Sequence, residues 1–296
     1  MKKLVLLLAA FVATAVLGST IASAEEKEKV VTASVSTSSV SVKVLDEYIS
    51  NQLYTGQGVF NRMNFKFSAL YRKHDNLSWD AYFVRCHRLK KIEELYGTPL
   101  LHNPSRSQKL KYSSWSFGYG TYYHWKFGEK LMVKTGGLCD IYASYKESIP
   151  DGVNNNANIE VQLMLKAHAA IKYGWDFKKW GLDLRANVSL PVMGLITADH
   201  PSEPAMSSFG TDDHSVMRPA VRHIFLGSYH NYMSLDYELG VDFVFKPLTL
   251  QLAHGSTSKW WKVYDVQNIR QINYWSLGVA FDIVSRNRFK STNNNF

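Results

Sequence analysis

Apolar and polar residues alternate one by one along several long segments of this chain. The clearest case is NIEVQLMLKAHAAIKYGWDF, residues 158–177, in which every second residue from Val161 to Phe177 is apolar or aromatic. The same alternation recurs in residues 63–72, 114–127, 180–190 and 233–245. Successive side chains of a β-strand point to opposite faces, so this period of two predicts strands with one apolar and one polar face.

The length of these segments indicates where the apolar face lies. They run for a dozen residues or more, whereas strands of globular proteins usually have about 5–6. About 9–11 residues tilted by roughly 45° cross a bilayer. In lipid every backbone amide needs a partner, so a membrane sheet must close on itself. The pattern therefore predicts an all-β fold, a transmembrane antiparallel up-and-down β-barrel, in preference to a soluble β-protein.

Ten strands are predicted, near residues 34–45, 59–72, 77–87, 111–127, 130–145, 158–177, 180–193, 222–245, 248–257 and 269–284. Short turns at 73–76, 127–130, 178–179 and 246–247 alternate with longer connections at 88–110, 146–157, 194–220 and 257–268. Bacterial outer-membrane barrels have short periplasmic turns, longer extracellular loops and an even number of strands. Both ends of the chain would then lie on the periplasmic side.

Two connecting segments leave alternatives open. Residues 217–230 could begin one long strand or form an extra hairpin arm, and the second case would give twelve strands. The segment RLKKIEELYG, residues 88–97, is interpreted as a charged loop stretch or a short loop helix.

The apolar parity is predicted to face lipid and the polar parity to face the lumen. Ten strands make a barrel only slightly wider than the eight-stranded kind that side chains fill, so opposite charges are expected to pair across it. The lumen candidates carry both signs: Lys134, Asp140, Glu160, Lys166, His168, Lys172, Asp183, Arg185, Asp236, Glu238 and Asp242.

Aromatic and sulfur-containing residues refine this assignment. Five tryptophans on the lipid parity are predicted to form interfacial girdles near strand ends. Cys86 has lumen parity and Cys139 lipid parity, on strands that are not neighbours, which argues against a disulfide. The five tryptophans are Trp115, Trp125, Trp175, Trp180 and Trp275.

The first residues, MKKLVLLLAAFVATAVLGSTIASA, have the composition of an export signal. A basic pair precedes a short apolar run, and Ala22-Ser23-Ala24 forms a cleavage site. We therefore expect a signal peptide over residues 1–24 and the barrel domain over residues 25–296. The expected location is the cell outer membrane, reached from the periplasm after cleavage.

The charge and the motifs of the chain limit the kinds of partner that are expected. The formal net charge is +9, and Lys and Arg at the outer rim are expected to pair with the phosphates of lipopolysaccharide. Outer-membrane lipid is the other expected partner, and nucleic acid is not expected for an exported chain. The sequence has no Gly-rich phosphate loop, CxxC or HExxH motif, so no cofactor is expected. The oligomeric state is left open.

Three residues form a candidate catalytic set. His254 and Ser256, followed by Asn268, resemble the His-x-Ser and Asn arrangement of outer-membrane phospholipase A. Ser256 would be the nucleophile and His254 its general base, with Asn268 orienting the imidazole. The opposing interpretation is a strand end entering an extracellular loop.

The segment ADHPSEPAMSSFGTDDH carries a second candidate set. Asp199, His200, Asp212 and His214 could lie at the extracellular rim, where ten-stranded outer-membrane proteases use Asp and His. Such a cluster could also hold a metal ion. The same residues are favoured in solvated turns, which is the opposing interpretation.

Four segments in order resemble a Bacteroidetes family of uncharacterised secreted β-barrel proteins, a domain of unknown function. They are LDEYISNQLYTG (45–56), GVNNNANIE (152–160), SLPVMG (189–194) and FLGSYHNYMSLDYELGVDF (225–243). The resemblance implies an outer-membrane barrel and assigns no activity or catalytic residues. The segment YWSLGVAFDI (274–283) also resembles the final strand that barrel-assembly machinery reads, which makes that machinery an expected partner during biogenesis.

These observations favour one function and leave two alternatives. The favoured function is a non-enzymatic outer-membrane barrel that is structural or interacts with ligands through its extracellular loops. The first alternative is a narrow channel for small solutes. The second is a hydrolase of the phospholipase type that uses His254 and Ser256.

Overall fold

The computed structural model describes residues 28–47, 50–72, 77–97, 109–128, 130–149, 157–177, 179–197, 224–245, 247–263 and 265–286. The predicted signal peptide and the predicted rim cluster at 199–214 lie outside these ranges. No helix in the described residues is long and apolar enough to span a membrane.

The described chain consists of β-strands. They are β1 (Glu28–Asp46), β2 (Ser50–Arg72), β3 (Leu77–Gly97), β4 (Lys109–Phe127), β5 (Leu131–Ile149), β6 (Ala157–Asp176), β7 (Gly181–Thr197), β8 (Ile224–Gly227), β9 (Tyr232–Phe245), β10 (Leu248–Val263) and β11 (Val266–Arg286).

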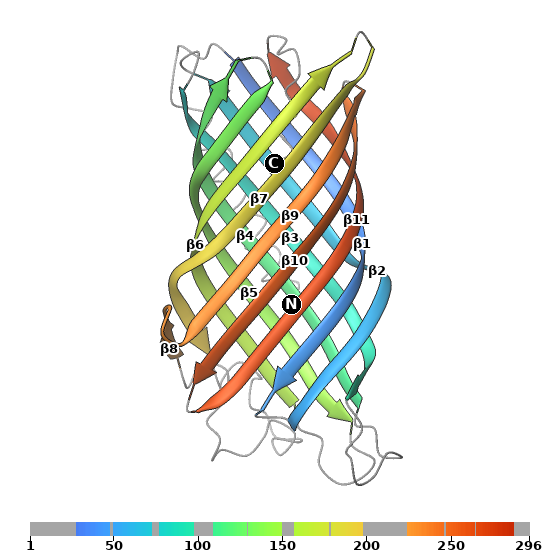
Figure 1. Ribbon diagram of the computed structural model, residues 1–296, viewed down its shortest axis with the longest axis vertical. Helices are drawn as coiled ribbons and strands as arrows, with labels where there is room; N and C mark the ends of the chain where they lie inside the picture. The colour runs from blue at the N-terminus through green and yellow to red at the C-terminus, as the bar shows by residue number, and fades with distance from the viewer. Residues whose placement is uncertain are drawn as a thin grey trace, which may run out of the picture.

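The strands form one antiparallel sheet that closes on itself. Each long strand pairs with its neighbours along the chain, and β1 pairs with β11 over nearly its whole length. The pairing of β6 with β7 and of β7 with β9 completes the ring. Figure 1 shows the tilted strands wrapping around the resulting barrel. The predicted antiparallel up-and-down barrel is confirmed.

The segment that left the strand count open forms an interrupted strand. β7 pairs with β9 up to Ser189 and with β8 from Gly194, so β8 and β9 occupy one place in the ring. Between them a turn is closed by the Asn231 side chain, which accepts from the Ser228 amide (2.9 Å) and donates to the Leu226 carbonyl (2.9 Å). The described residues form eleven strands, but the ring that they close has ten places rather than twelve.

Several strands extend beyond their predicted ends, most of them at the end where β1 stops, the lower end in Figure 1. The main exception is β1 itself, which begins six residues before its predicted start at residue 34. Residues 88–97 are strand and not a loop helix, which corrects that interpretation. Strands β10 and β11 are separated only by residues 264–265, where a long connection was predicted. Past the bilayer neither face needs to be apolar, so the alternation fades although the strand continues.

The strict alternation of short and long connections was therefore wrong. At the lower end, the two-residue turn at 264–265 and the short connection at 47–49 accompany the longer ones at 98–108, 150–156 and 198–223. Asp265 has a φ of 64°, a left-handed conformation that Asp tolerates better than most residues. At the opposite end, the start of β1 and the end of β11 pair through Lys29 and Arg286, on the same side as the short turns.

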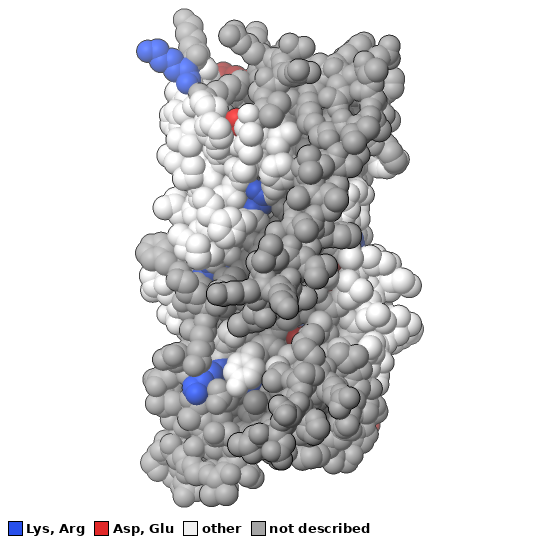
Figure 2. All heavy atoms as spheres, turned by 180° about the vertical axis from the view of Figure 1, so that it is seen from behind, with Lys and Arg blue, Asp and Glu red and all other residues white. Residues whose placement is uncertain are grey.

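The outer wall of the barrel is apolar. Large hydrophobic side chains on its surface include Leu165, Leu239, Leu277 and Phe281, which are 48%, 54%, 58% and 48% exposed. Charged atoms are sparse on the described part of the face in Figure 2. In water such a surface would be unfavourable, whereas in hydrocarbon it is required. The predicted lipid-facing parity agrees with this surface.

Aromatic side chains gather near the end that carries the short turns. Phe177 stacks on Trp180 at 4.2 Å between ring centroids, and Tyr173 meets Trp175 edge-on at 4.6 Å. This agrees with a girdle at the membrane interface. Trp275 is an exception, since it lies midway along β11 opposite His254. Cys139 is a free thiol, as the parity argument predicted.

The outer wall leads to a prediction about how the cost of a charged residue depends on its depth in the bilayer. Leu277→Arg, midway along β11, is expected to lower the free energy of unfolding by about 2–4 kcal/mol because it places a cation in hydrocarbon. Ile283→Arg, on the same face near the strand end, is expected to cost about 0–1 kcal/mol. Guanidinium unfolding in lipid vesicles measures both, and equal, small costs would contradict a lipid-facing wall.

Candidate functional site in the barrel lumen

The lumen is lined by buried polar and charged side chains. The eleven charged and polar residues predicted to point inward fall on the inner face, and ten of them are less than 10% exposed; the other is the partly buried Glu238. Their parity places them there, because the opposite face of each strand is the apolar outer wall. What these groups contact across the lumen decides whether the barrel is open.

Charged side chains from opposite walls meet in the half of the lumen nearer the end of the barrel where β1 stops. We call this group the cross-lumen layer, and it consists of Asp46, Lys146, Asn158, Glu160, Asn268 and Arg270. The Lys146 ammonium forms an ion pair with Asp46, although three strands separate β1 from β5 around the ring. The two side chains can meet only by reaching across the interior of the barrel.

Further contacts connect this layer to other strands. Lys146 Nζ lies 3.3 Å from Glu160 Oε2, and Arg270 Nη1 lies 3.7 Å from Glu160 Oε1. Asn158 Nδ2 donates to Asp46 Oδ2 at 3.4 Å. The Asn268 amide, in the orientation that satisfies both groups, donates to the two Asp46 oxygens at 2.9 and 3.2 Å. The layer thus joins β1, β5, β6 and β11.

Aromatic rings reinforce the layer. The Tyr142 ring lies 3.8 Å from both the Lys259 ammonium and the Arg270 guanidinium, and its hydroxyl hydrogen-bonds Tyr112 at 2.6 Å. Trp261 lies 5.7 Å from Arg270. Cations over desolvated aromatic faces are stabilised by about 2 kcal/mol. These contacts hold β4, β5, β10 and β11 against one another through the lumen.

Ion pairs continue through the middle of the barrel, mostly between neighbouring strands. Lys166 Nζ lies 2.7 Å from both Asp140 and Asp236. Arg185 pairs with Glu238 and, at 3.1 Å, with Asp242. Lys172 pairs with Asp183 at 2.8 Å. Opposite charges therefore pair inside the barrel, but the predicted pairing across the lumen occurs in the cross-lumen layer, whereas these pairs join strands that are neighbours or nearly so.

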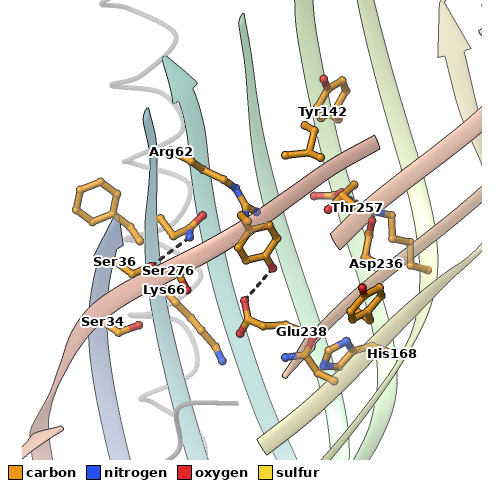
Figure 3. A pocket seen from close by; sticks show the side chains of 18 of the residues that line it. Ser34, Ser36, Arg62, Lys66, Tyr142, His168, Asp236, Glu238, Thr257 and Ser276 are labelled. Carbon is orange, nitrogen blue, oxygen red and sulfur yellow. Dashed lines mark hydrogen bonds and ion pairs between the residues drawn. The ribbon is translucent and has the colours of Figure 1, made fainter. Parts of the chain in front are cut away.

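A polar cavity of about 120 Å³ lies in the middle of the lumen. Its walls carry the hydroxyl groups of several serines and of Thr257 together with Arg62, Lys166, Arg185 and Lys259. Figure 3 shows two hydrogen bonds at its edge, from Asn64 to Ser36 (3.1 Å) and from a tyrosine, Tyr274, to Glu238 (2.9 Å). The cavity is small, buried and lined mainly by hydrogen-bonding groups.

The candidate catalytic residues do not meet. His254 and Ser256 point to the outer face of β10, where His254 packs against Trp275 at 4.6 Å between ring centroids. Asn268 points into the lumen and contacts Asp46. Ser256 pairs across the ladder with Asn273, five residues along β11 from Asn268. The wall of the barrel therefore separates Asn268 from the other two side chains.

His254 instead borders an apolar depression in the outer wall. The depression is lined by Leu184, Ala186, Leu239, Leu252 and Trp275 among others. The second candidate set, Asp199, His200, Asp212 and His214, lies outside the described residues. Within the described ranges, no three His, Cys, Asp or Glu side chains are arranged to hold a metal ion.

Sequence reasoning missed most of the cross-lumen layer. Asp46 and Lys146 each lie one residue beyond a predicted strand end, at 45 and 145, and were assigned to connections. Continuing the parity of residues 130–145 by one residue would have placed Lys146 in the lumen. In the first strand the alternation gave no such guide, because Val40, Val42 and Val44 share the parity of Asp46 and are buried with it inside the barrel. Arg270 lay inside a predicted strand with lumen parity, but nothing in one sequence indicates which opposite wall it meets.

Comparison with known families gives one match. Residues 3–285 match the family described as Protein of unknown function (DUF3316). No curated protein matches the sequence.

Several solved structures are similar in outline. The outer membrane protease OmpT from Escherichia coli aligns with a TM-score of 0.46 and 8% identity, over 88% of this chain and 99% of that one. The translocator domain of the autotransporter NalP from Neisseria meningitidis gives 0.38 and 8%, over 89% and 91%. Ail, the attachment invasion locus protein of Yersinia pestis, gives 0.31 and 11%, over 85% and 98%. These values support no inference about activity.

The cross-lumen layer generates a prediction about stability. Lys146→Ala is expected to lower the free energy of unfolding by about 3–5 kcal/mol, because it leaves the buried Asp46 carboxylate without its cation. Asp46→Asn combined with Lys146→Met is expected to cost much less, because no charge is left unpaired. Guanidinium unfolding measures both costs, and comparison of Asp46→Asn, Lys146→Met and their combination gives the coupling energy.

The exposed pair Lys262–Asp265 (2.9 Å) is the matched control. Lys262→Ala is expected to cost about 0–1 kcal/mol, since water screens this pair. If Lys146→Ala were no more costly than Lys262→Ala, the ion pair across the lumen would not exist in solution.

Proposed function

Because the chain belongs to the DUF3316 family, whose description assigns no function, we propose from its structure that it is a non-conducting outer-membrane barrel. Its role is structural, or it binds partners through the connections at the end of the barrel opposite the chain termini. The observation that supports this most strongly is the cross-lumen layer, which joins opposite walls of the barrel.

The narrow channel is less well supported by the same contacts. A conducting lumen needs a continuous path of water, with ions bound weakly enough to leave. Here buried ammonium, guanidinium and carboxylate groups hold one another across the path, and Tyr112, Tyr142 and Trp261 fill the space around them. Opening the path would require breaking buried ion pairs, which costs several kcal/mol each.

The phospholipase-type hydrolase has the weakest support. It requires His254, Ser256 and Asn268 at hydrogen-bonding distance from one another, whereas Asn268 faces Asp46 inside the barrel. The outer face near His254 is an apolar depression, whose chemistry suits contact with acyl chains rather than hydrolysis.

The location follows from the outer wall and the first residues of the chain. We infer export by a signal peptide over residues 1–24 and insertion into the outer membrane of a Gram-negative bacterium, with Bacteroidetes as the proposed source group. Insertion would use barrel-assembly machinery, which would read the strand that contains residues 274–283. The apolar wall would contact outer-membrane lipid, and basic side chains at the rim would contact lipopolysaccharide.

Conductance of the purified protein in planar bilayers tests the proposal. The wild type is expected to give no steady current. Lys146→Ala combined with Arg270→Ala is expected to produce openings, because it removes both cations that join opposite walls. Circular dichroism of the β-sheet checks that this variant remains folded. If the wild type conducts steadily and the variant conducts equally, the channel would be established and the hypothesis of a closed barrel would be excluded.

A further inference from the structure

The cavity in the middle of the lumen has more buried positive charge than its carboxylates neutralise. Its acidic groups are Asp140, Asp236 and Glu238. Lys166 bridges the two aspartates, and Arg185 holds Glu238. All three carboxylates therefore already have cationic partners.

Arg62 on β2 and Lys259 on β10 form no ion pair with a carboxylate of the described chain. Arg62 is 7% exposed and lies 3.9 Å from the centre of the Tyr274 ring, and its Nη1 atom is buried without a hydrogen-bond partner. Lys259 is 3% exposed and donates to the neutral Gln162 at 3.0 Å. A buried cation without a counter-charge is costly, so the arrangement favours a bound anion.

The remaining lining supplies donors for such an anion. Figure 3 shows Arg62 extending among the side chains around the cavity, with Ser34, Ser36, Thr257 and Ser276 also on its wall. Hydroxyl groups can rotate to donate to an oxyanion, and a guanidinium can donate two parallel hydrogen bonds to it. These groups come from β1, β2, β10 and β11, on one side of the barrel.

We propose that this cavity binds one small oxyanion, such as phosphate or a short carboxylate, between Arg62 and Lys259. The cavity volume of about 120 Å³ is several times the roughly 10–15 Å³ that one buried water requires, so an anion of four or five heavy atoms fits. Binding at this site needs no conducting path and does not require that the lumen be closed, so it is independent of the proposed function.

Isothermal titration of the full-length mature protein in detergent tests the site. Sodium phosphate and sodium acetate are the two probes, each at constant ionic strength. The wild type is expected to bind one phosphate, acetate or both per barrel in a saturable, exchangeable manner. Arg62→Gln and Lys259→Gln are each expected to weaken binding about tenfold or more, the effect of losing one hydrogen bond to a charged group.

Charge-conserving and surface variants make the test specific. Lys259→Arg is expected to retain most of the affinity, because it preserves the charge. Lys262→Gln removes an exposed lysine of the same strand, 47% exposed in its side chain, and is expected to leave affinity unchanged. Circular dichroism establishes that each variant is folded.

Two results would overturn the proposal. One is the absence of saturable binding of either probe by the folded wild type. The other is binding that Lys262→Gln weakens as much as Lys259→Gln, which would mean that the anion associates with the surface through general attraction.

Discussion

A backbone amide inside hydrocarbon must find its hydrogen-bond partner within the protein, because no water is present to accept it. In this chain the constraint is met by pairing β1 with β11, so that the sheet has no open edge within the ring. In the closed barrel each strand has one face toward lipid and one face toward the lumen. The apolar face lies against lipid, and the polar face therefore lines the lumen.

Ten strands enclose a narrow interior, and its width decides how the charges behave. Long side chains such as Lys146 and Arg270 reach far enough to meet groups on the opposite wall. The loss of hydration makes a buried ion pair a weak source of stability, whereas an unpaired buried charge is strongly destabilising. We interpret the ion pairs as selecting the strand register, because a shift of one residue would turn charges toward lipid.

Much of the fold could be predicted from one sequence, because lipid on one side imposes alternation residue by residue. The starts of β3 and β10, which follow short turns, were predicted to within a residue, and so were both ends of β6. The far ends of β3 and β10 were not, since residues such as 88–97 lie where both faces can be polar. The lumen-facing set was predictable by parity, but its partners across the barrel depend on ring size, strand tilt and register together. For that reason the contacts that Lys146, Arg270 and Lys259 make with the opposite wall are known only from the structure.

The proposal of a closed lumen depends above all on one contact, the ion pair between Asp46 and Lys146 across the barrel. Solid-state NMR of the protein in lipid bilayers measures it directly, through dipolar coupling between the Lys146 side-chain nitrogen and the Asp46 carboxyl carbon. If the barrel is closed, the coupling is expected to be strong, because the Lys146 nitrogen and an Asp46 oxygen then lie within about 4 Å of each other. No detectable coupling, together with rapid solvent exchange of the Lys146 ammonium protons, would mean that water fills the lumen and that the walls do not meet.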